Sequence, residues 1–310
     1  MEFAEELKNK TEQIEQRIFA YMPKESSFQK TVIDAMQYTM EAGGKRIRPM
    51  LMVETYHLFG GKDKFIEPFM AAIEMIHTYS LIHDDLPALD NDDYRRGRKT
   101  AHVVYGEAMA ILAGDSLLNY AYETAAKAYT MVERADREDI SAMQRELQMR
   151  RAVDQAMTIL AARPGIYGMI GGQVADVELT GTRLTKEQLL YIYENKTGAL
   201  IEAAMLIGAV LAGASDKELE KIRQVAYNVG MAFQIQDDIL DETATFEELG
   251  KPIHSDEVSG KVTYVTIHGI EDSRKEVEYL SREAVDIVKD FNGDASFLIA
   301  LITYLIDRTY

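Results

Sequence analysis

An acidic segment places the strongest constraint on how this chain can fold: five aspartates lie within ten positions, from Asp84 to Asp93, and Arg95 and Arg96 follow. Adjacent carboxylates repel each other, so a fold that keeps them ionised usually supplies a cation. Oxygen ligands with no Cys or His pair suit a hard ion such as Mg²⁺. The two arginines suit phosphate oxygens that would complete its coordination. Taken alone, the segment could also be a solvated acidic loop.

A second acidic segment favours the metal-binding interpretation. Residues 233–241 carry Asp237, Asp238 and Asp241 inside an apolar run. Asp237 and Asp241 are four positions apart, so on a helix they share one face with Gln234 a turn earlier. Carboxylates among Phe, Ile and Leu are costly to bury unless something pairs with them. We therefore expect two acidic boxes to face one cavity and to bind a polyanion through shared metal ions.

Composition narrows the class of protein. The 310 residues carry a formal net charge of -17, which argues against nucleic acid and anionic membranes as partners. No cysteine is present, which excludes disulfides and thiol chemistry and is compatible with a reducing cytosol. The longest apolar stretch, Gly198 to Ala214, contains Glu202 and is slightly short for a membrane span. The acidic N-terminus has no apolar signal region. We expect a cytoplasmic protein without stable membrane insertion.

The residue pattern predicts an all-α fold. Only six prolines occur, and long stretches are rich in Ala, Leu, Ile, Met and Glu. Nothing indicates a β-hairpin, and residues 261–267, although rich in β-branched residues, are interpreted as the start of a helix. Length alone would suggest two domains, but no Pro- or Ser-rich linker is present. We therefore predict one domain over residues 1–310.

Several helices can be bounded by their apolar periodicity and end signals. They are expected at residues 2–21, 28–42, 67–85 and 106–128, with a charged, solvated helix or insert at 134–151. Gly43 and Gly44 would end the second helix. Pro87 would end or kink the third after Asp85, so Asp90 would be brought in by irregular backbone. Asp115 is expected to be buried in the fourth.

Basic residues gather at two further places. Lys45, Arg46 and Arg48 follow the two glycines and precede a helix, which could be an anion site or a solvated basic turn. His77 lies one heptad before Asp84, near the same helix face, where a core histidine is the commoner interpretation.

The other basic positions lie in the second half of the chain. Lys196 and Thr197 enter the most apolar helix at Gly198, where a ligand phosphate would serve as their partner. Lys251 and Lys261 lie on a loop interrupted by Gly and Pro, which could be a mobile phosphate lid or an ordinary surface loop.

Together these motifs resemble the trans-isoprenyl diphosphate synthases, most closely the short-chain bacterial farnesyl diphosphate synthase type. The resemblance is carried by Gly43–Pro49, both aspartate boxes in their order, Gly171-Gly172-Gln173 and Lys196-Thr197-Gly198. It covers nearly the whole chain. It implies a single large helical bundle around a deep central cavity, usually a homodimer.

The resemblance also implies residue roles. Mg²⁺ would be held by Asp84, Asp85, Asp90, Asp237, Asp238 and Asp241. The allylic diphosphate would be gripped with the help of Arg95, Lys196, Lys251 and Lys261. The diphosphate of isopentenyl diphosphate would be held by Lys45, Arg48, His77 and Arg96. Thr197 and Gln234 would line the reacting centre, and the chemistry would depend most on Asp84, Asp85, Asp237, Lys196, Thr197, Gln234 and Lys251.

The implied reaction ionises the allylic carbon–oxygen bond and joins the carbocation to isopentenyl diphosphate. Tyr79, five positions before the first aspartate, matches the aromatic residue of farnesyl-making relatives, whereas helical geometry alone does not place it in the product tunnel. We expect the fifteen-carbon product, with a geranylgeranyl diphosphate synthase as the alternative.

Two other classes of protein fit the sequence less well. A class I terpene cyclase fits less well because its second motif mixes Asn, Ser or Thr with Glu, and a non-catalytic subunit of a prenyltransferase pair would lack an acidic box or basic anchors. The chain departs from the family pattern at His254, at residues 163–167 and in the charged segment 134–151. These departures bear on the lid and on surface contacts.

Overall fold

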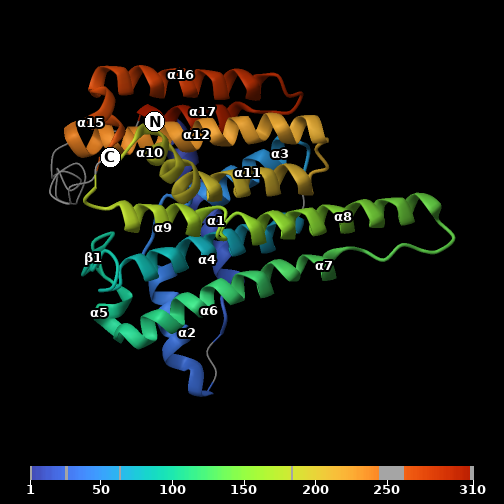
Figure 1. Ribbon diagram of the computed structural model, residues 1–310. Coiled ribbons are helices and arrows are strands. Elements are labelled where there is room, and N and C mark those ends of the chain that lie inside the picture. Colours follow the sequence, from blue (N-terminus) through green and yellow to red (C-terminus); the bar gives the residue numbers. More distant parts are fainter. Residues whose placement is uncertain (1, 25–26, 63, 183, 244–261, 308–310) are drawn as a thin grey trace. The chain divides into compact units, whose positions relative to one another are not determined.

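The computed structural model describes residues 2–24, 27–62, 64–182, 184–243 and 262–307. Helices account for about three quarters of the described residues and strands for very few, which confirms the predicted all-α class (Figure 1). The chain divides into two compact units, residues 1–53 with 63–157 and residues 54–62 with 158–310. None of the described helices is both long and apolar enough to span a membrane.

The first unit is built on two long helices, α4 and α6. Its elements are α1 (Glu2–Ala20), η1 (Ser27–Gln29), α2 (Lys30–Met40), the start of α3 (Ile47–Leu58), η2 (Lys64–Ile66), α4 (Glu67–Asp84), β1 (Tyr94–Arg95), β2 (Arg98–Lys99), α5 (Ala101–Tyr105), α6 (Glu107–Ala126), α7 (Ala128–Met131) and most of α8 (Ile140–Ala162). α4 is buried on almost every side, as expected for a helix that is apolar all round. His83 of α4 lies against Gly114 of α6, and Tyr79 lies near Tyr122, so the two helices run antiparallel. A side chain at position 114 would overlap the His83 imidazole, so glycine leaves room for the His83 ring in its present orientation.

The second unit is arranged around α12. Its elements include α9 (Met169–Leu179), α10 (Lys186–Ile192), η3 (Tyr193–Gly198), α11 (Ala199–Leu211), α12 (Asp216–Thr243), α15 (Tyr264–His268), α16 (Ile270–Lys289) and α17 (Ser296–Asp307). α12, α16 and α17 lie side by side (Figure 1, orange to red). The amphipathic α12 and α16 bury Ile235, Ile239, Val277 and Leu280 in a shared apolar cluster with Tyr193 of η3. This packing fixes the face of α12 that carries the second acidic box.

The expectation that no hairpin is present was wrong. β1 and β2 pair antiparallel, with Tyr94 opposite Lys99 and Arg95 opposite Arg98. The two-residue connection, Arg96-Gly97, has φ of 53° and 73°, as a type I′ turn requires. Arginine is not one of the residues that usually occupy the first position of such a turn. The sequence signal was therefore weak, although the turn brings Arg96 into the basic cluster described below.

Other boundaries were predicted more closely. The expected helix at 28–42 is a short 3₁₀ turn followed by α2, and residues 264–267 of the β-rich segment belong to the helix α15. The charged segment 134–151 is only partly helical, because α8 begins at Ile140. The expected burial of Asp115 was wrong: its side chain is 62% exposed. Asp115 occupies the solvent side of α6, where a carboxylate needs no partner.

One ion pair anchors the first unit. The Arg46 guanidinium donates to Glu74 at 2.7 Å, to Glu15 at 3.0 Å and to the Met40 carbonyl at 2.6 Å. Arg46 and Glu74 are both almost completely buried. The three acceptors come from α1, α2 and α4, so one side chain joins three helices.

Replacing Arg46 by Ala is expected to lower the free energy of unfolding by about 3–5 kcal/mol, because Glu74 would be left as an unpaired buried charge. Equilibrium denaturation followed by circular dichroism measures this. The matched control is Lys30→Ala, which removes the half-exposed pair with Asp34 and should cost less than about 1 kcal/mol. Equal losses in the two variants would contradict the anchoring role.

Candidate functional site

The first acidic box lies where α4 ends. Asp85 caps the helix, and the backbone then turns so that the Asp90 amide donates to the Asp84 carbonyl at 2.8 Å. Asn91 has a positive φ of 54°, and its amide returns to the Leu86 carbonyl. This tight turn brings Asp90 back beside the end of the helix, as expected from the irregular backbone around Pro87.

Within this box, Asp85 and Arg95 form a pair. Two nitrogens of the Arg95 guanidinium lie 2.6 Å from Asp85 Oδ1, and Asp92 lies 3.6 Å from the same group. Burial raises the pKa of Asp85 to about 6, although the Arg95 charge opposes this rise. Asp85 was expected to bind a metal ion and Arg95 a phosphate, but in this structure the two side chains pair with each other. Binding of a metal and a diphosphate would redistribute both groups.

A cluster of cations lies in the same unit, formed by Arg48 and Arg96 beside His77. Arg48 Nη1 lies 3.4 Å from His77 Nε2. The Arg48 Nε is buried and, among the described residues, has no hydrogen-bond partner. Lys45 is partly exposed and lies three residues before Arg48. Because an unmade hydrogen bond on a buried guanidinium is costly, this atom indicates an anionic ligand.

The electrostatics of the cluster agree with this interpretation. Burial lowers the pKa of Arg48 to about 10; Glu74 opposes the shift and Arg96 adds to it. Burial and the surrounding arginines, Arg48 first, hold the pKa of His77 well below its usual range, so His77 is neutral at pH 7. Arg96 donates to the Gly43 carbonyl and packs on Gly44, where a Cβ would lie 2.7 Å from the guanidinium. An anion bound here would relieve the repulsion between these cations.

The second acidic box divides into residues with different surroundings. Asp237 is partly exposed, whereas Asp238 and Asp241 are 4% and 5% exposed. Asp238 Oδ2 accepts hydrogen bonds from the Tyr193 hydroxyl and, at 2.8 Å, from the Tyr264 amide. Asp238 therefore joins α12 to η3 and to the start of α15. From the sequence, the three aspartates are equivalent candidate metal ligands. The hydrogen bonds to Tyr193 and Tyr264 show that Asp238 also stabilises the packing of these helical elements.

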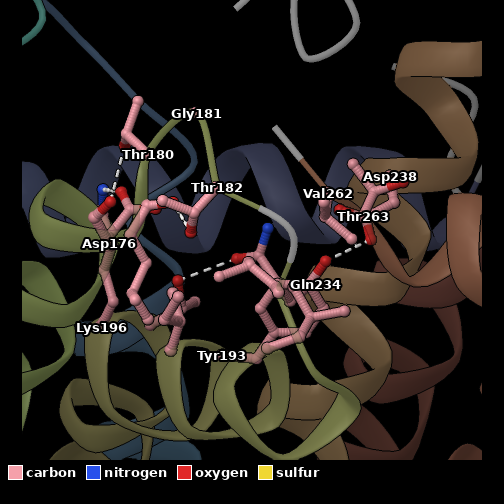
Figure 2. Close-up of a pocket in the computed structure, with 15 residues that line it drawn as sticks. Asp176, Thr180, Gly181, Thr182, Tyr193, Lys196, Gln234, Asp238, Val262 and Thr263 are labelled. Carbon is pink, nitrogen blue, oxygen red and sulfur yellow. Dashed lines mark hydrogen bonds and ion pairs between the residues drawn. The ribbon is translucent and has the colours of Figure 1, made fainter. Parts of the chain in front are cut away.

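A pocket of about 130 Å³ lies beside this box in the second unit (Figure 2). Lys196 Nζ pairs with Asp176 Oδ2 at 2.6 Å, and the Thr197 hydroxyl donates to Gln234 Oε1 at 2.9 Å. Figure 2 shows Lys196 directed toward Asp176 on one side of the pocket and Gln234 on the other. Three of the predicted residues are thus brought together with Asp238 around one cavity.

Asp176 has no role among the residues predicted from the sequence. Its position nevertheless marks it as a candidate site residue, because it follows the Gly171-Gly172-Gln173 motif and shares a helix face with Gln173. The partner of Lys196, however, lies twenty positions away on another helix and could be found only from the fold. Lys251, Lys261 and His254 lie outside the described residues.

Tyr79 is buried in α4, with its ring 5.8 Å from that of His83 in an edge-to-face arrangement. Burial, with Tyr122 and Asp84 nearby, raises the pKa of Tyr79 to about 12. Its hydroxyl is buried and has no hydrogen-bond partner among the described residues. Tyr79 therefore acts as bulk in an apolar layer.

The carboxylates suit Mg²⁺ that is shared with a substrate. Among the described residues, no group of three or more His, Asp or Glu side chains is close enough to hold a metal ion alone. Mg²⁺ typically binds one or two protein carboxylates and takes its other oxygens from water and phosphates. The all-oxygen donors at the end of α4 and on α12 fit that mode of binding.

Comparison with known proteins agrees with this geometry. Residues 29–296 match the family model described as polyprenyl synthetase. A geranylgeranyl diphosphate synthase from Cyanophora paradoxa is 43% identical over 278 residues, 89% of this chain and 87% of the relative. A dimethylallyltranstransferase from Fischerella ambigua is 43% identical over 290 residues, 92% of this chain and 78% of the relative.

Solved structures are similar along almost the whole chain. An FPP/GFPP synthase from Zymomonas mobilis has a TM-score of 0.82 at 27% identity, covering 98% of this chain and 99% of that one. A geranyltransferase from Helicobacter pylori, complexed with magnesium and isoprenyl diphosphate, has a TM-score of 0.79 at 31% identity, with 99% and 97% covered. The chain belongs to the polyprenyl synthetase family and is a trans-prenyltransferase.

The contacts of the second box generate a test. Asp238→Ala should lower the free energy of unfolding by about 1–3 kcal/mol, because the Tyr264 amide and Tyr193 hydroxyl lose a buried acceptor. Asp237→Ala, on the partly exposed neighbour, should cost clearly less. Urea denaturation of both variants measures the difference. If Asp237→Ala is the more destabilising variant, Asp238 does not stabilise the packing of α12 in the way inferred here.

Proposed function

We propose that this chain is a short-chain prenyltransferase that condenses dimethylallyl or geranyl diphosphate with isopentenyl diphosphate and releases pyrophosphate, with farnesyl diphosphate as product. The observation that carries the proposal is the Arg48 guanidinium, whose buried Nε has no hydrogen-bond partner among the described residues and which lies in a cluster with Arg96 and neutral His77. Such a cluster fits a diphosphate bound without metal. The two acidic boxes fit a second diphosphate bound with metal.

Isopentenyl diphosphate is assigned to the cationic cluster. Arg48 and Arg96 would donate charge-assisted hydrogen bonds to its phosphate oxygens, with Lys45 supplying a further charge. Neutral His77 can donate or accept one hydrogen bond according to its tautomer, without adding to the positive charge. The contact between Arg96 and the Gly43 carbonyl would hold the guanidinium ready for the ligand.

The allylic diphosphate is assigned to the acidic boxes. Asp84, Asp85, Asp90, Asp237, Asp238 and Asp241 are the proposed carboxylates, with Asp238 acting chiefly by shaping the box. Bound Mg²⁺ would supply Lewis-acid stabilisation of the negative charge that develops on the departing pyrophosphate. Lys196 and Arg95, with Lys251 and Lys261, would add positive charge at the same group.

The proposed reaction breaks the allylic carbon–oxygen bond, and the electron pair leaves with pyrophosphate. The alkene of isopentenyl diphosphate then donates its electron pair to form the new carbon–carbon bond, which leaves a cation on the isopentenyl unit. A pyrophosphate oxygen accepts a proton from the carbon next to that cation, and the electron pair of the broken C–H bond forms the new double bond. Lys196 stabilises the charge on the leaving group, while Thr197 and Gln234 line the reacting centre. Apolar walls exclude water, which would otherwise capture the carbocation.

The fifteen-carbon product rests on Tyr79. The side chain lies in α4, five residues before Asp84, which is roughly 7.5 Å along the helix. Its buried ring, braced against His83, would stop a growing chain. The runner-up is the twenty-carbon product, favoured by the name of the Cyanophora paradoxa relative. A non-catalytic subunit is a weaker alternative, since both acidic boxes and the basic anchors are present.

Three further expectations belong to this proposal. One catalytic domain is supported by a family match that runs through both units without interruption. A homodimer is supported by the exposed apolar side chains Val103, Val104, Ile111 and Leu112 on α5 and α6. A cytoplasmic location is supported by the absence of cysteine.

The direct test is incubation with isopentenyl diphosphate, Mg²⁺ and each allylic diphosphate in turn, followed by chain-length analysis of the products. Farnesyl diphosphate as the main product supports the proposal, and geranylgeranyl diphosphate supports the runner-up. No condensation with any allylic substrate, by protein that binds the substrates, would favour the non-catalytic subunit.

Arg48→Ala should weaken binding of isopentenyl diphosphate more than that of the allylic substrate. The loss of a charge-assisted hydrogen bond costs on the order of 1.5–3 kcal/mol, roughly tenfold or more in affinity. Steady-state kinetics with each substrate varied measure the two KM values. A rise in the allylic KM alone would mean that the two sites are exchanged.

Tyr79→Ala should lengthen the product by at least one isoprene unit, because removal of the ring opens space behind the first box. Chromatography of the dephosphorylated products measures chain length. Tyr79→Phe, which keeps the ring and removes only the hydroxyl, is the control and should leave the length unchanged. If Tyr79→Ala gives the wild-type length, another residue forms the floor.

A further inference from the structure

A π-helical turn carries two of the proposed reacting-centre residues. α10, η3 and α11 form one continuous helical path, in which residues Tyr193–Gly198 adopt the wider π-helix. π-helices are rare and occur mostly as single turns inserted into α-helices, frequently at functional sites. Lys196 and Thr197 lie in this turn, and both line the pocket of Figure 2. We therefore expect contacts from neighbouring helices to stabilise the π-helical geometry at this position.

On one side, α9 approaches the turn through Gly172. A Cβ at position 172 would overlap the Lys196 backbone nitrogen and lie 2.8 Å from the Asn195 carbonyl carbon. The backbones of α9 and η3 are therefore in direct contact. One helical turn beyond Gly172, Asp176 pairs with Lys196 Nζ at 2.6 Å. The close approach thus brings a carboxylate of α9 within reach of the lysine ammonium.

On the other side, α12 repeats the arrangement through Gly230. A Cβ at position 230 would lie 3.1 Å from the Gly198 Cα, tighter than most real Cβ contacts. One helical turn beyond Gly230, Gln234 accepts the hydrogen bond from the Thr197 hydroxyl at 2.9 Å. Each neighbouring helix therefore offers a glycine to the backbone of the turn and, four residues later, a polar partner to its side chain.

We propose that Gly172 and Gly230 are positioning residues that clamp the π-helical turn, so that Lys196 and Thr197 are held in register with the departing diphosphate. The inference rests on the proposed function for its catalytic consequence, but the clamp itself is a property of the second unit. An added methyl group at either glycine pushes a helix away from the turn. The partner four residues later then moves out of reach.

Gly172→Ala and Gly230→Ala test the clamp, with Val174→Ala on the exposed side of α9 as the control. A displacement of about 1 Å at a reacting group can cost on the order of a hundredfold in rate. Gly172→Ala is expected to lower kcat by about that factor, and Gly230→Ala by less, since its contact is looser. The KM for isopentenyl diphosphate should stay unchanged in both. Val174→Ala should behave as wild type.

A double-mutant cycle separates positioning from general packing. In a Lys196→Ala background, Gly172→Ala should cause no further loss of kcat, because the side chain it positions is already absent. An equal loss in both backgrounds would overturn the proposal. Amide hydrogen exchange of residues 193–198 should rise in both glycine variants and not in Val174→Ala. Unchanged exchange in both glycine variants would also overturn it.

The readouts remain informative if one part of the scheme fails. If Gly172→Ala does not fold, Gly230→Ala carries the same test through the Thr197→Ala background and the same exchange measurement. If the wild-type protein does not condense prenyl diphosphates, the proposed function fails. Hydrogen exchange and a crystal structure of Gly230→Ala then decide whether the turn and its Thr197–Gln234 contact depend on the clamp.

Discussion

Burial of charge is the constraint on which both units depend. A guanidinium removed from water must find a partner because it stays charged, whereas a buried carboxylate or imidazole can also respond by a pKa shift toward its neutral form. Arg46 meets the demand with Glu74 and Glu15, and Asp85 meets it with Arg95. His77 meets it by staying neutral. Among the described residues, the buried Nε of Arg48 has no hydrogen-bond partner, and for that reason we propose an anionic ligand there.

The contrast between Arg46 and Arg48 shows what the sequence could and could not predict. Both belong to one short basic motif, which the sequence alone leaves open between an anion site and a solvated basic turn. Only the fold separates the arginine that joins three helices from the one proposed to bind a ligand, because the partners of Arg46 lie 28 and 31 positions away. The periodicity of the helices was sufficient for the all-α class. The Arg96-Gly97 turn was missed because its first residue is unusual for a type I′ turn.

The same limit applies to the pocket. Lys196, Thr197 and Gln234 were identified by residue type and position, but the π-helical geometry of 193–198 has no sequence signature. It arises where two helices approach closely enough to contact the backbone, and glycine permits that approach at Gly172 and Gly230. From the sequence, Gly172 could be read only as allowing close packing or close substrate approach. Which backbone segment Gly172 contacts depends on the tertiary structure.

Product length depends on a different kind of information from reaction chemistry. In the proposed function the charged motifs act at the diphosphate end of the substrates, where hydrogen-bond geometry and metal ligation restrict the choice of residue. The hydrocarbon end is bounded by apolar volume, where one ring more or less changes the space without disturbing charge balance. Tyr79 illustrates the difference, since its hydroxyl has no partner among the described residues and its ring provides only bulk. Similar proteins carry names that refer to products of different length, as the geranylgeranyl diphosphate synthase and the FPP/GFPP synthase illustrate. Family membership therefore fixes the class of reaction, prenyl transfer, but leaves the product length to be inferred from the packing around Tyr79.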